Sequence, residues 1–271
     1  MTLGPSQVGA TVDVSPFDLR PDAAALVEGT RSEAQTSAAA LCLHGLTGTP
    51  YEVRPIAEAL VARGVRAKGI WMAGHNGTVE DLARTKYSEW VGLAREALDE
   101  LCAAHDRVYV VGVSMGGLVS LRLAETARVD GLVTVGAPLE LAPPIPQLLP
   151  MLRLFRKSRP KKTSGVEDPE ALSRHPTFPA MPFDSVRELI RLQKEVVADL
   201  GKIECPILVA HGEHDGTARP RDAHRLFAAV GTAEAEKRLM MLARSGHVAT
   251  VDYDGPELAR AAAAFLTSPR G

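Results

Sequence analysis

Short apolar runs that alternate with helical stretches constrain the fold of this chain more than any other feature. The runs cover residues 38–43, 65–70, 108–113, 131–135 and 206–210, and a shorter one covers 238–242. Continuous apolar runs of this length are typical of strands that are buried on both faces of a parallel sheet. Because strands alternating with helices form βαβ units, we expect an α/β fold: a mostly parallel central sheet flanked by helices on both faces.

The helical stretches lie between these runs, at 54–63, 87–104, 115–127, 221–230 and 256–266. In the second of them, Trp90, Leu93 and Ala97 recur at the spacing of one helix face. Ahead of the first run, residues 1–37 are expected to form an N-terminal tail with short edge strands near 17–19 and 25–28.

The alternation stops for roughly 60 residues after Glu140, far longer than an ordinary loop. This gap is not featureless, because 143–155 and 185–200 both carry apolar residues at helical spacing. We therefore expect residues 140–200 to form an inserted helical lid, and 38–139 with 201–271 to form the core. The basic cluster from Arg153 to Lys162 is expected to be a solvated lid tip.

Charge and cysteine content exclude several classes of protein. A formal net charge of -2 argues against a general nucleic-acid binder. The three cysteines, Cys42, Cys102 and Cys205, show no ligand spacing and are expected to be reduced thiols, so no metal or other cofactor is predicted. No signal peptide or membrane-spanning run is visible, and the expected location is the cytoplasm.

The motif Gly112-Val-Ser114-Met-Gly116 carries the strongest chemical signal. It follows an apolar run and precedes a helical stretch, so the serine is expected on a sharp strand-to-helix turn with its Oγ exposed. Glycines flank the turn because side chains there would collide with neighbouring backbone. The start of the helix also favours developing negative charge. These features predict Ser114 as a catalytic nucleophile.

A serine nucleophile needs a base, and the base needs an orienting acid. His247 lies after the last predicted strand, at the sheet edge where Ser114 is expected. Asp215 follows the strand before it, which gives the chain order Ser, Asp, His. Glu213 and Asp222 are rival acids. Asp222 is expected on the next helix, facing solvent, so Asp215 is preferred.

Acyl transfer also needs two N–H donors for the developing oxyanion. One is expected to be the main-chain N–H of Met115, which follows the nucleophile. The other is expected from the loop His44-Gly-Leu46-Thr-Gly48, with Leu46 N–H as the donor. This loop lacks the Lys-Ser/Thr ending of a phosphate-binding loop, so nucleotide binding is not predicted. The glycine-bearing loop 74–78 is expected to shape a pocket rim or cap a turn.

Through these residues the chain resembles the α/β-hydrolase superfamily, and within it the small bacterial carboxylesterases and monoacylglycerol lipases. The resembling stretches are 43–50, 74–75 with 80–82 and Trp90, 112–117, 212–215 and 245–247. The resemblance implies an α/β-hydrolase fold with a short helical lid, Ser114, Asp215 and His247 as the triad, and Leu46 and Met115 as oxyanion donors. Many relatives have glycine at the place of Asn76 and a larger aliphatic residue at the place of Ala218, which bears on pocket shape.

The resemblance further implies a carboxylesterase for short to medium acyl chains, acting on a small ester through an acyl-enzyme. The apolar stretch 145–155 of the expected lid suggests that this ester is apolar. A monoacylglycerol lipase or a thioesterase would use the same residues, and a C–C hydrolase or perhydrolase would keep the triad. A ligand receptor without turnover is the alternative from another class, since fold does not dictate function. We expect a monomer or homodimer with no nucleic-acid partner and no integral membrane segment.

Overall fold

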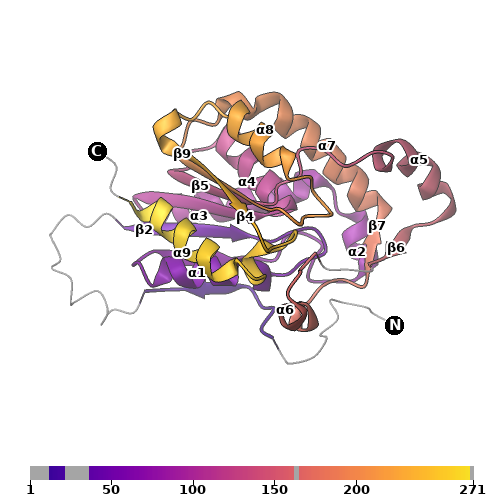
Figure 1. The fold of residues 1–271 in the computed structure, drawn as a ribbon, viewed down its shortest axis with the longest axis horizontal. Helices are drawn as coiled ribbons and strands as arrows, with labels where there is room; N and C mark the ends of the chain where they lie inside the picture. Colours follow the sequence, from indigo (N-terminus) through magenta and orange to yellow (C-terminus); the bar gives the residue numbers. More distant parts are fainter. Residues whose placement is uncertain (1–11, 22–36, 162–164, 269–271) are drawn as a thin grey trace.

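The computed structural model describes residues 12–21, 37–161 and 165–268. Its strands include β1 (Phe17–Leu19), β2 (Ala38–Leu43), β3 (Arg66–Gly69), β4 (Arg107–Val113), β5 (Gly131–Val135), β8 (Ile207–Gly212) and β9 (Lys237–Leu242). These seven form one sheet in the order β1-β3-β2-β4-β5-β8-β9 (Figure 1). β1 is antiparallel to β3, and every other neighbouring pair is parallel. The predicted mostly parallel sheet is confirmed.

Helices cover both faces of this sheet (Figure 1). They include α1 (Arg54–Val61), α2 (Val79–Arg84), α3 (Tyr87–Ala104), α4 (Met115–Thr126), α8 (Arg221–Ala229) and α9 (Gly255–Thr267). α1 packs beside α9 on one face, whereas α3 and α4 pack together on the other. α2 was not predicted, because six residues are too few to show a period. Its start is marked instead by a capping box between Thr78 and Asp81.

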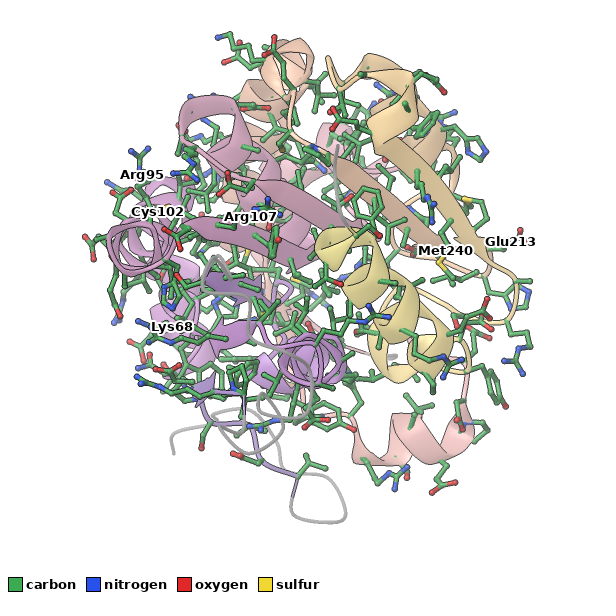
Figure 2. The ribbon with its side chains drawn as sticks, turned by 90° about the vertical axis from the view of Figure 1, so that its left-hand side faces the viewer. Lys68, Arg95, Cys102, Arg107, Glu213 and Met240 are labelled. Carbon is green, nitrogen blue, oxygen red and sulfur yellow. The ribbon has the colours of Figure 1, made fainter. Side chains whose placement is uncertain are left out.

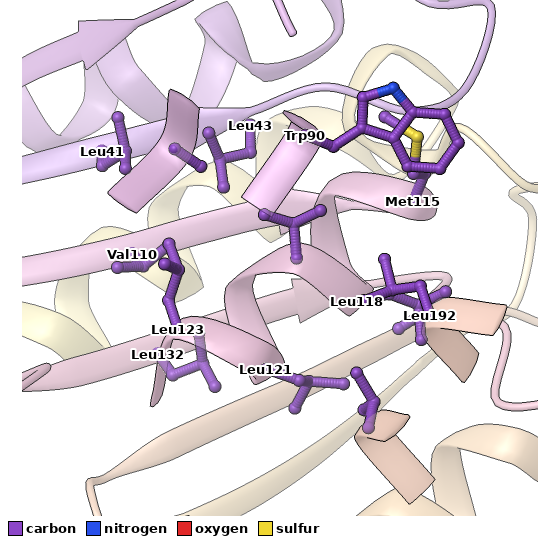
Figure 3. Close-up of a cluster of buried hydrophobic side chains, with 14 of the residues drawn as sticks. Leu41, Leu43, Trp90, Val110, Met115, Leu118, Leu121, Leu123, Leu132 and Leu192 are labelled. Atoms are coloured by element: carbon purple, nitrogen blue, oxygen red, sulfur yellow. The ribbon is translucent and has the colours of Figure 1, made fainter. Parts of the chain in front are cut away.

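The pleat of β2 divides its side chains between two apolar clusters. Leu41 and Leu43 belong to a cluster with Trp90 of α3 (Figure 3), and Ala40 and Cys42 belong to a cluster on the other face. All four are fully buried. Complete burial of a leucine stabilises the fold by about 1.5–3 kcal/mol. Since β2 is buried on both faces, its sequence reads as a continuous apolar run rather than an alternating one.

The chain between β5 and β8, residues 136–206, is here called the β5–β8 connection. It holds α5 (Ile145–Phe155), β6 (Ser158–Pro160), α6 (Pro169–Arg174), β7 (Ala180–Pro182) and α7 (Phe183–Asp199), and β6 pairs antiparallel with β7. α7 packs against α4 and adds Leu192 and Val196 to the main core. α5 lies at one end of the molecule (Figure 1) and exposes Leu154 and Phe155.

The edge of the sheet where the parallel strands begin differs from the edge where they end. Figure 2 shows the molecule from the side of Arg107, where β4 begins, with Lys68 of β3 and Met240 of β9 on opposite sides. The parallel strands end on the far side, and the polar loops that follow β2, β4, β8 and β9 meet there. The strand predicted at 25–28 lies outside the described residues.

Candidate active site

Ser114 lies at the turn from β4 into α4, in a backbone conformation that L-residues rarely adopt. Its φ is 54° and its ψ is -116°. The turn is tight, because a Cβ on Gly116 would lie 2.1 Å from the carbonyl oxygen of Leu43. A Cβ on Gly112 would lie 2.3 Å from the Gly116 oxygen. The glycines of the motif are therefore required by close backbone approach, and the strained turn presents Ser114 at the sheet edge.

The structure brings Ser114, His247 and Asp215 into one hydrogen-bonded chain. His247 Nε2 lies 2.8 Å from Ser114 Oγ, and His247 Nδ1 lies 2.7 Å from Asp215 Oδ2. Because a carboxylate only accepts, Nδ1 carries the proton, and Nε2 is left as the acceptor for the serine hydroxyl. His247 and Asp215 are both buried, which strengthens these interactions. The arrangement can deprotonate Ser114 as it attacks a carbonyl group.

The other oxygen of Asp215 is also occupied. Oδ1 accepts hydrogen bonds from the amides of Thr217 and Ala218, both at 2.8 Å. Burial alone would raise the pKa of Asp215, but His247 and His211 hold that pKa well below its usual value. Asp215 therefore remains ionised and oriented beside His247.

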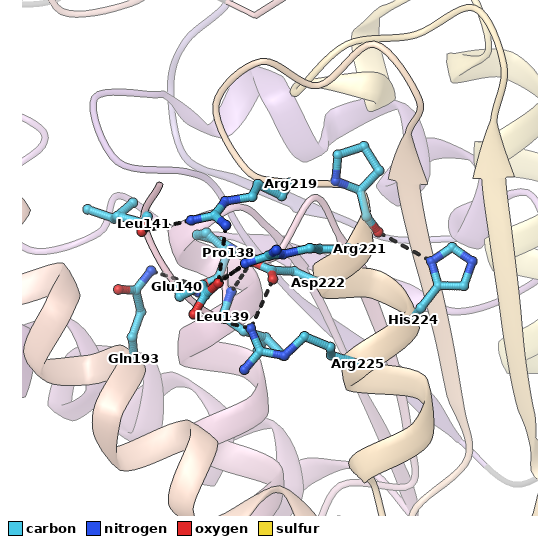
Figure 4. A network of polar contacts seen from close by, with 11 residues as sticks. Pro138, Leu139, Glu140, Leu141, Gln193, Arg219, Arg221, Asp222, His224 and Arg225 are labelled. Carbon is cyan, nitrogen blue, oxygen red and sulfur yellow. Dashed lines mark hydrogen bonds and ion pairs between the residues drawn. The ribbon is translucent and has the colours of Figure 1, made fainter. Parts of the chain in front are cut away.

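The structure places the two rival acids elsewhere. Glu213 is exposed. Asp222 lies on α8 as predicted, but it is fully buried, so the expectation that it faces solvent is wrong. Its Oδ2 accepts from the amides of Leu139 and Glu140, at 3.0 and 3.3 Å (Figure 4). Asp222 thus stabilises the start of the β5–β8 connection.

Sequence reasoning missed His211 as a neighbour of the triad. This buried residue of β8 has its Nε2 only 2.9 Å from Asp215 Oδ2. Its position four residues before Asp215, at the end of a predicted strand, was the available signal. His211 gives the carboxylate a second imidazole contact besides His247.

The loop after β2 lies directly against Ser114. A Cβ on Gly45 would be 3.2 Å from Ser114 Cβ. Leu46 follows in this loop, and Met115 is the first residue of α4. Within the part of the chain that the structure describes, neither amide has a hydrogen-bond acceptor. Two unpaired N–H groups therefore lie near Ser114, as an oxyanion site requires.

Two buried neutral histidines support this loop. His44 Nε2 accepts from the amide of Met72 at 3.1 Å, and His75 Nε2 accepts from the amide of Thr47 at 3.3 Å. Burial lowers the pKa of His75 to about 3, with a further contribution from His44, and burial also lowers the pKa of His44. Neutral rings are needed because a protonated nitrogen could not accept these bonds. The sequence had suggested only a rim or turn role for the loop that contains His75.

A buried carboxylate, Glu52, links this loop to the β5–β8 connection. Its Oε2 accepts from the amide of Gly45 at 2.9 Å, and its Oε1 lies 3.2 Å from His175 Nε2. Burial opposes ionisation, but His175, His44 and the Gly45 amide lower the pKa of Glu52 to about 2. Glu52 is therefore a fixed negative charge beneath the loop.

Gly165 of the β5–β8 connection lies directly against His247. Its φ is 73°, and a Cβ there would lie 2.7 Å from His247 Cβ. We expect Gly165→Ala to displace His247 and to lower kcat by about 10- to 100-fold, because small misplacements of a group that must act on Ser114 Oγ are costly. Steady-state kinetics checks this result. Gly92→Ala is the control, since nothing lies within 4 Å of its added Cβ, and a Gly165→Ala enzyme with wild-type kcat would contradict the assignment.

Within the described ranges, no group of three or more His, Cys, Asp or Glu side chains is placed to hold a metal ion. Among the helices described, none is both long and apolar enough to cross a membrane.

Known sequences match most of this chain. Residues 34–254 match the Hydrolase_4 family, described as serine aminopeptidase, S33. The thermostable monoacylglycerol lipase of Bacillus sp. (strain H-257) is 30% identical over 232 residues, which cover 85% of this chain and 91% of that protein. The carboxylesterase of Bacillus subtilis (strain 168) is 26% identical over 217 residues, covering 80% and 87% respectively.

Solved structures share the fold. A solved structure described under LipS and LipT, two metagenome-derived lipolytic enzymes, matches with a TM-score of 0.83 at 22% identity, covering 94% of this chain and 98% of that one. The monoacylglycerol lipase of Paleococcus ferrophilus matches with a TM-score of 0.73 at 19% identity, covering 86% and 96%. Together with the sheet order, these matches confirm the predicted α/β-hydrolase fold.

Proposed function

We propose that this chain, which belongs to the Hydrolase_4 family described as serine aminopeptidase, S33, hydrolyses carboxylic esters through an acyl-enzyme on Ser114. The observation that carries the proposal is the chain of contacts from Ser114 Oγ to His247 and on to Asp215, at 2.8 and 2.7 Å. The relatives named above as a carboxylesterase and a monoacylglycerol lipase support ester hydrolysis rather than peptide cleavage.

The proposed reaction has two halves. His247 takes the proton of Ser114 as Oγ attacks the ester carbonyl, and the imidazolium is stabilised by Asp215. The leaving alcohol then receives that proton, and an acyl-enzyme remains. Water attacks the acyl-enzyme by the same route, which releases the acid and restores Ser114. Every proton moves through His247 Nε2, so the reaction needs no further acid or base.

The amides of Leu46 and Met115 are proposed to bind the oxyanion in both halves. Their lack of other acceptors supports this role, because an amide engaged elsewhere could not turn to the substrate. Met115 also begins α4, where the aligned peptide dipoles favour negative charge. Such preorganised donors are worth about 10²- to 10³-fold each in kcat for acyl transfer.

The β5–β8 connection, within which the lid was predicted at 140–200, is proposed to cover the acyl site. Gly165 contacts His247, and Thr177 contacts the loop that holds Leu46. Within this connection, α5 is rich in apolar residues, which supports an apolar ester as the substrate. Hydrolysis of monoacylglycerols is a second candidate, favoured by the relative of that name at 30% identity.

Turnover of a p-nitrophenyl ester series, from acetate to long acyl chains, tests the proposal. We expect the highest kcat/KM on short to medium chains, and stoichiometric labelling by an organophosphonate that peptide mass spectrometry locates at Ser114. A maximum on long chains would instead favour the lipase candidate. Absence of turnover on all chains, or labelling at another residue, would overturn the mechanism and favour a receptor or a C–C hydrolase.

A further inference from the structure

Thr47 is the most constrained residue of the loop that follows β2. Its φ is 64°, and besides Ser114 it is the only non-glycine residue with positive φ in the described ranges. A β-branched residue in this conformation is strained, by about 1–3 kcal/mol, and persists only where its surroundings hold it there. Thr47 directly follows Leu46, the proposed oxyanion donor. What holds Thr47 therefore also decides where the Leu46 amide points.

All the polar atoms of Thr47 are engaged. Its amide donates to His75, and its carbonyl oxygen accepts from the Phe178 amide at 3.0 Å and from Thr177 Oγ1 at 2.9 Å. Its own Oγ1 donates to the Leu46 carbonyl oxygen at 2.5 Å. The same Oγ1 accepts from Lys161 Nζ at 3.1 Å. Three of these five contacts come from the β5–β8 connection.

Lys161 is unlike the other cations of its segment. Its side chain is half-buried, and its Nζ donates to Thr177 Oγ1 at 2.6 Å as well as to Thr47. Burial lowers the pKa of this lysine, and Glu52 partly offsets that effect. Among the described residues no carboxylate forms an ion pair with it. The expectation of a solvated tip holds for the exposed Arg156 and Lys157, but it is wrong for Lys161.

Such a lysine calls for an explanation beyond stability. Burying an ammonium group without a paired carboxylate opposes folding unless other groups replace its water. Here the replacing groups are two threonine hydroxyls, and one of them belongs to the strained residue beside Leu46. Lys161 also leaves Thr47 Oγ1 with its own proton to donate to the Leu46 carbonyl, because the ammonium can only donate.

We propose that Lys161 is a positioning residue of the oxyanion site: through Thr47 it holds the Leu46 amide in the orientation that the transition state requires. The inference rests on the proposed function, because it assumes that the Leu46 amide binds the oxyanion. It makes the β5–β8 connection part of the apparatus for acyl transfer as well as a cover for the substrate.

The variant Lys161→Met tests this role, because it keeps the length and packing of the side chain and removes its donors. We expect kcat on the best p-nitrophenyl ester to fall by about 10- to 100-fold, which does not exceed the fall expected when an oxyanion donor is removed altogether. KM should change by less than about threefold. Affinity for an aryl trifluoromethyl ketone should fall by the same factor, since its tetrahedral adduct places an oxyanion in the site. Lys157→Met, at an exposed lysine of the same segment, should leave both unchanged.

Thr47→Val provides an independent test if Lys161→Met does not fold. Valine is also β-branched, so it matches the backbone strain and removes only the hydroxyl. We expect a similar loss of kcat and of ketone affinity, and the double variant should be no worse than either single variant.

Wild-type kcat in Lys161→Met and Thr47→Val, or a fall in kcat with unchanged ketone affinity, would overturn the positioning role. Ser114→Ala, assayed in parallel, separates this outcome from a failure of the proposed function. If Ser114→Ala is inactive while Lys161→Met is fully active, only the positioning role is lost. If Ser114→Ala remains active, the proposed function itself is wrong.

Discussion

Ser114→Ala is expected to lower kcat on the best p-nitrophenyl ester by about 10⁴-fold or more, with little change in KM. The reason is that only Oγ is removed, and Oγ forms the bond to the acyl group. Alanine leaves the main-chain hydrogen bonds of this position in place: its amide donates to the carbonyl oxygen of Val135, and its carbonyl oxygen accepts from the amide of Leu118. The protein should therefore fold, and circular dichroism with a thermal midpoint close to wild type would verify that. Active-site titration with an organophosphonate should show no labelled fraction.

Ser120→Ala is the matched control for this experiment. Ser120 lies on the same helix, is fully buried, and donates its hydroxyl to the Gly116 carbonyl oxygen at 2.7 Å. The variant tests whether activity needs any buried hydroxyl near the turn. We expect its kcat to stay within about twofold of wild type, because one such hydrogen bond contributes only about 0.5–1.5 kcal/mol, and it contributes to stability. Residual activity of Ser114→Ala above about one part in 100 would show that the acyl group is carried elsewhere.

The strands were predictable because burial on both faces makes them continuous apolar runs. β2 and β5 have the predicted bounds, and β4 begins one residue early. α3 also has its predicted bounds, because five turns of a helix give a clear period. The short elements gave no such signal. α6 has only six residues and is marked by a capping Asp168 followed by Pro169, a local feature that periodicity does not detect.

The residues of the site divide in the same way. Ser114, Asp215 and His247 each follow a predicted strand, so the rule that parallel strands end at one edge was sufficient to bring them together. Lys161 and Thr47 are 114 positions apart in the sequence. Their contact depends on how the β5–β8 connection folds back over the sheet edge, and no periodicity or motif expresses that path. A half-buried cation is also indistinguishable from a solvated one when only the residue type and its sequence neighbours are known.

Asp215→Asn is expected to lower kcat by about 10³- to 10⁴-fold while the fold is retained. The structure decides which way the asparagine would turn. Oδ1 of Asp215 accepts from the amides of Thr217 and Ala218, so the asparagine oxygen must take that place. Its amide group would then face His247 Nδ1 and donate to it. His247 would carry its proton on Nε2 and could no longer accept the proton of Ser114.

The two rival acids provide the controls, and pH provides a further check. Asp222→Asn changes an equally buried aspartate that also accepts hydrogen bonds from main-chain amides, and Glu213→Gln changes an exposed glutamate. Both variants should keep kcat within a few-fold of wild type. A loss in Asp222→Asn as large as that in Asp215→Asn would refute the assignment of the acid. Because its surroundings hold the pKa of Asp215 below the usual value, this carboxylate stays ionised as the pH falls. A decline of wild-type activity toward acid pH should therefore not come from protonation of Asp215, and Asp215→Asn should stay inactive at every pH where the wild-type enzyme works.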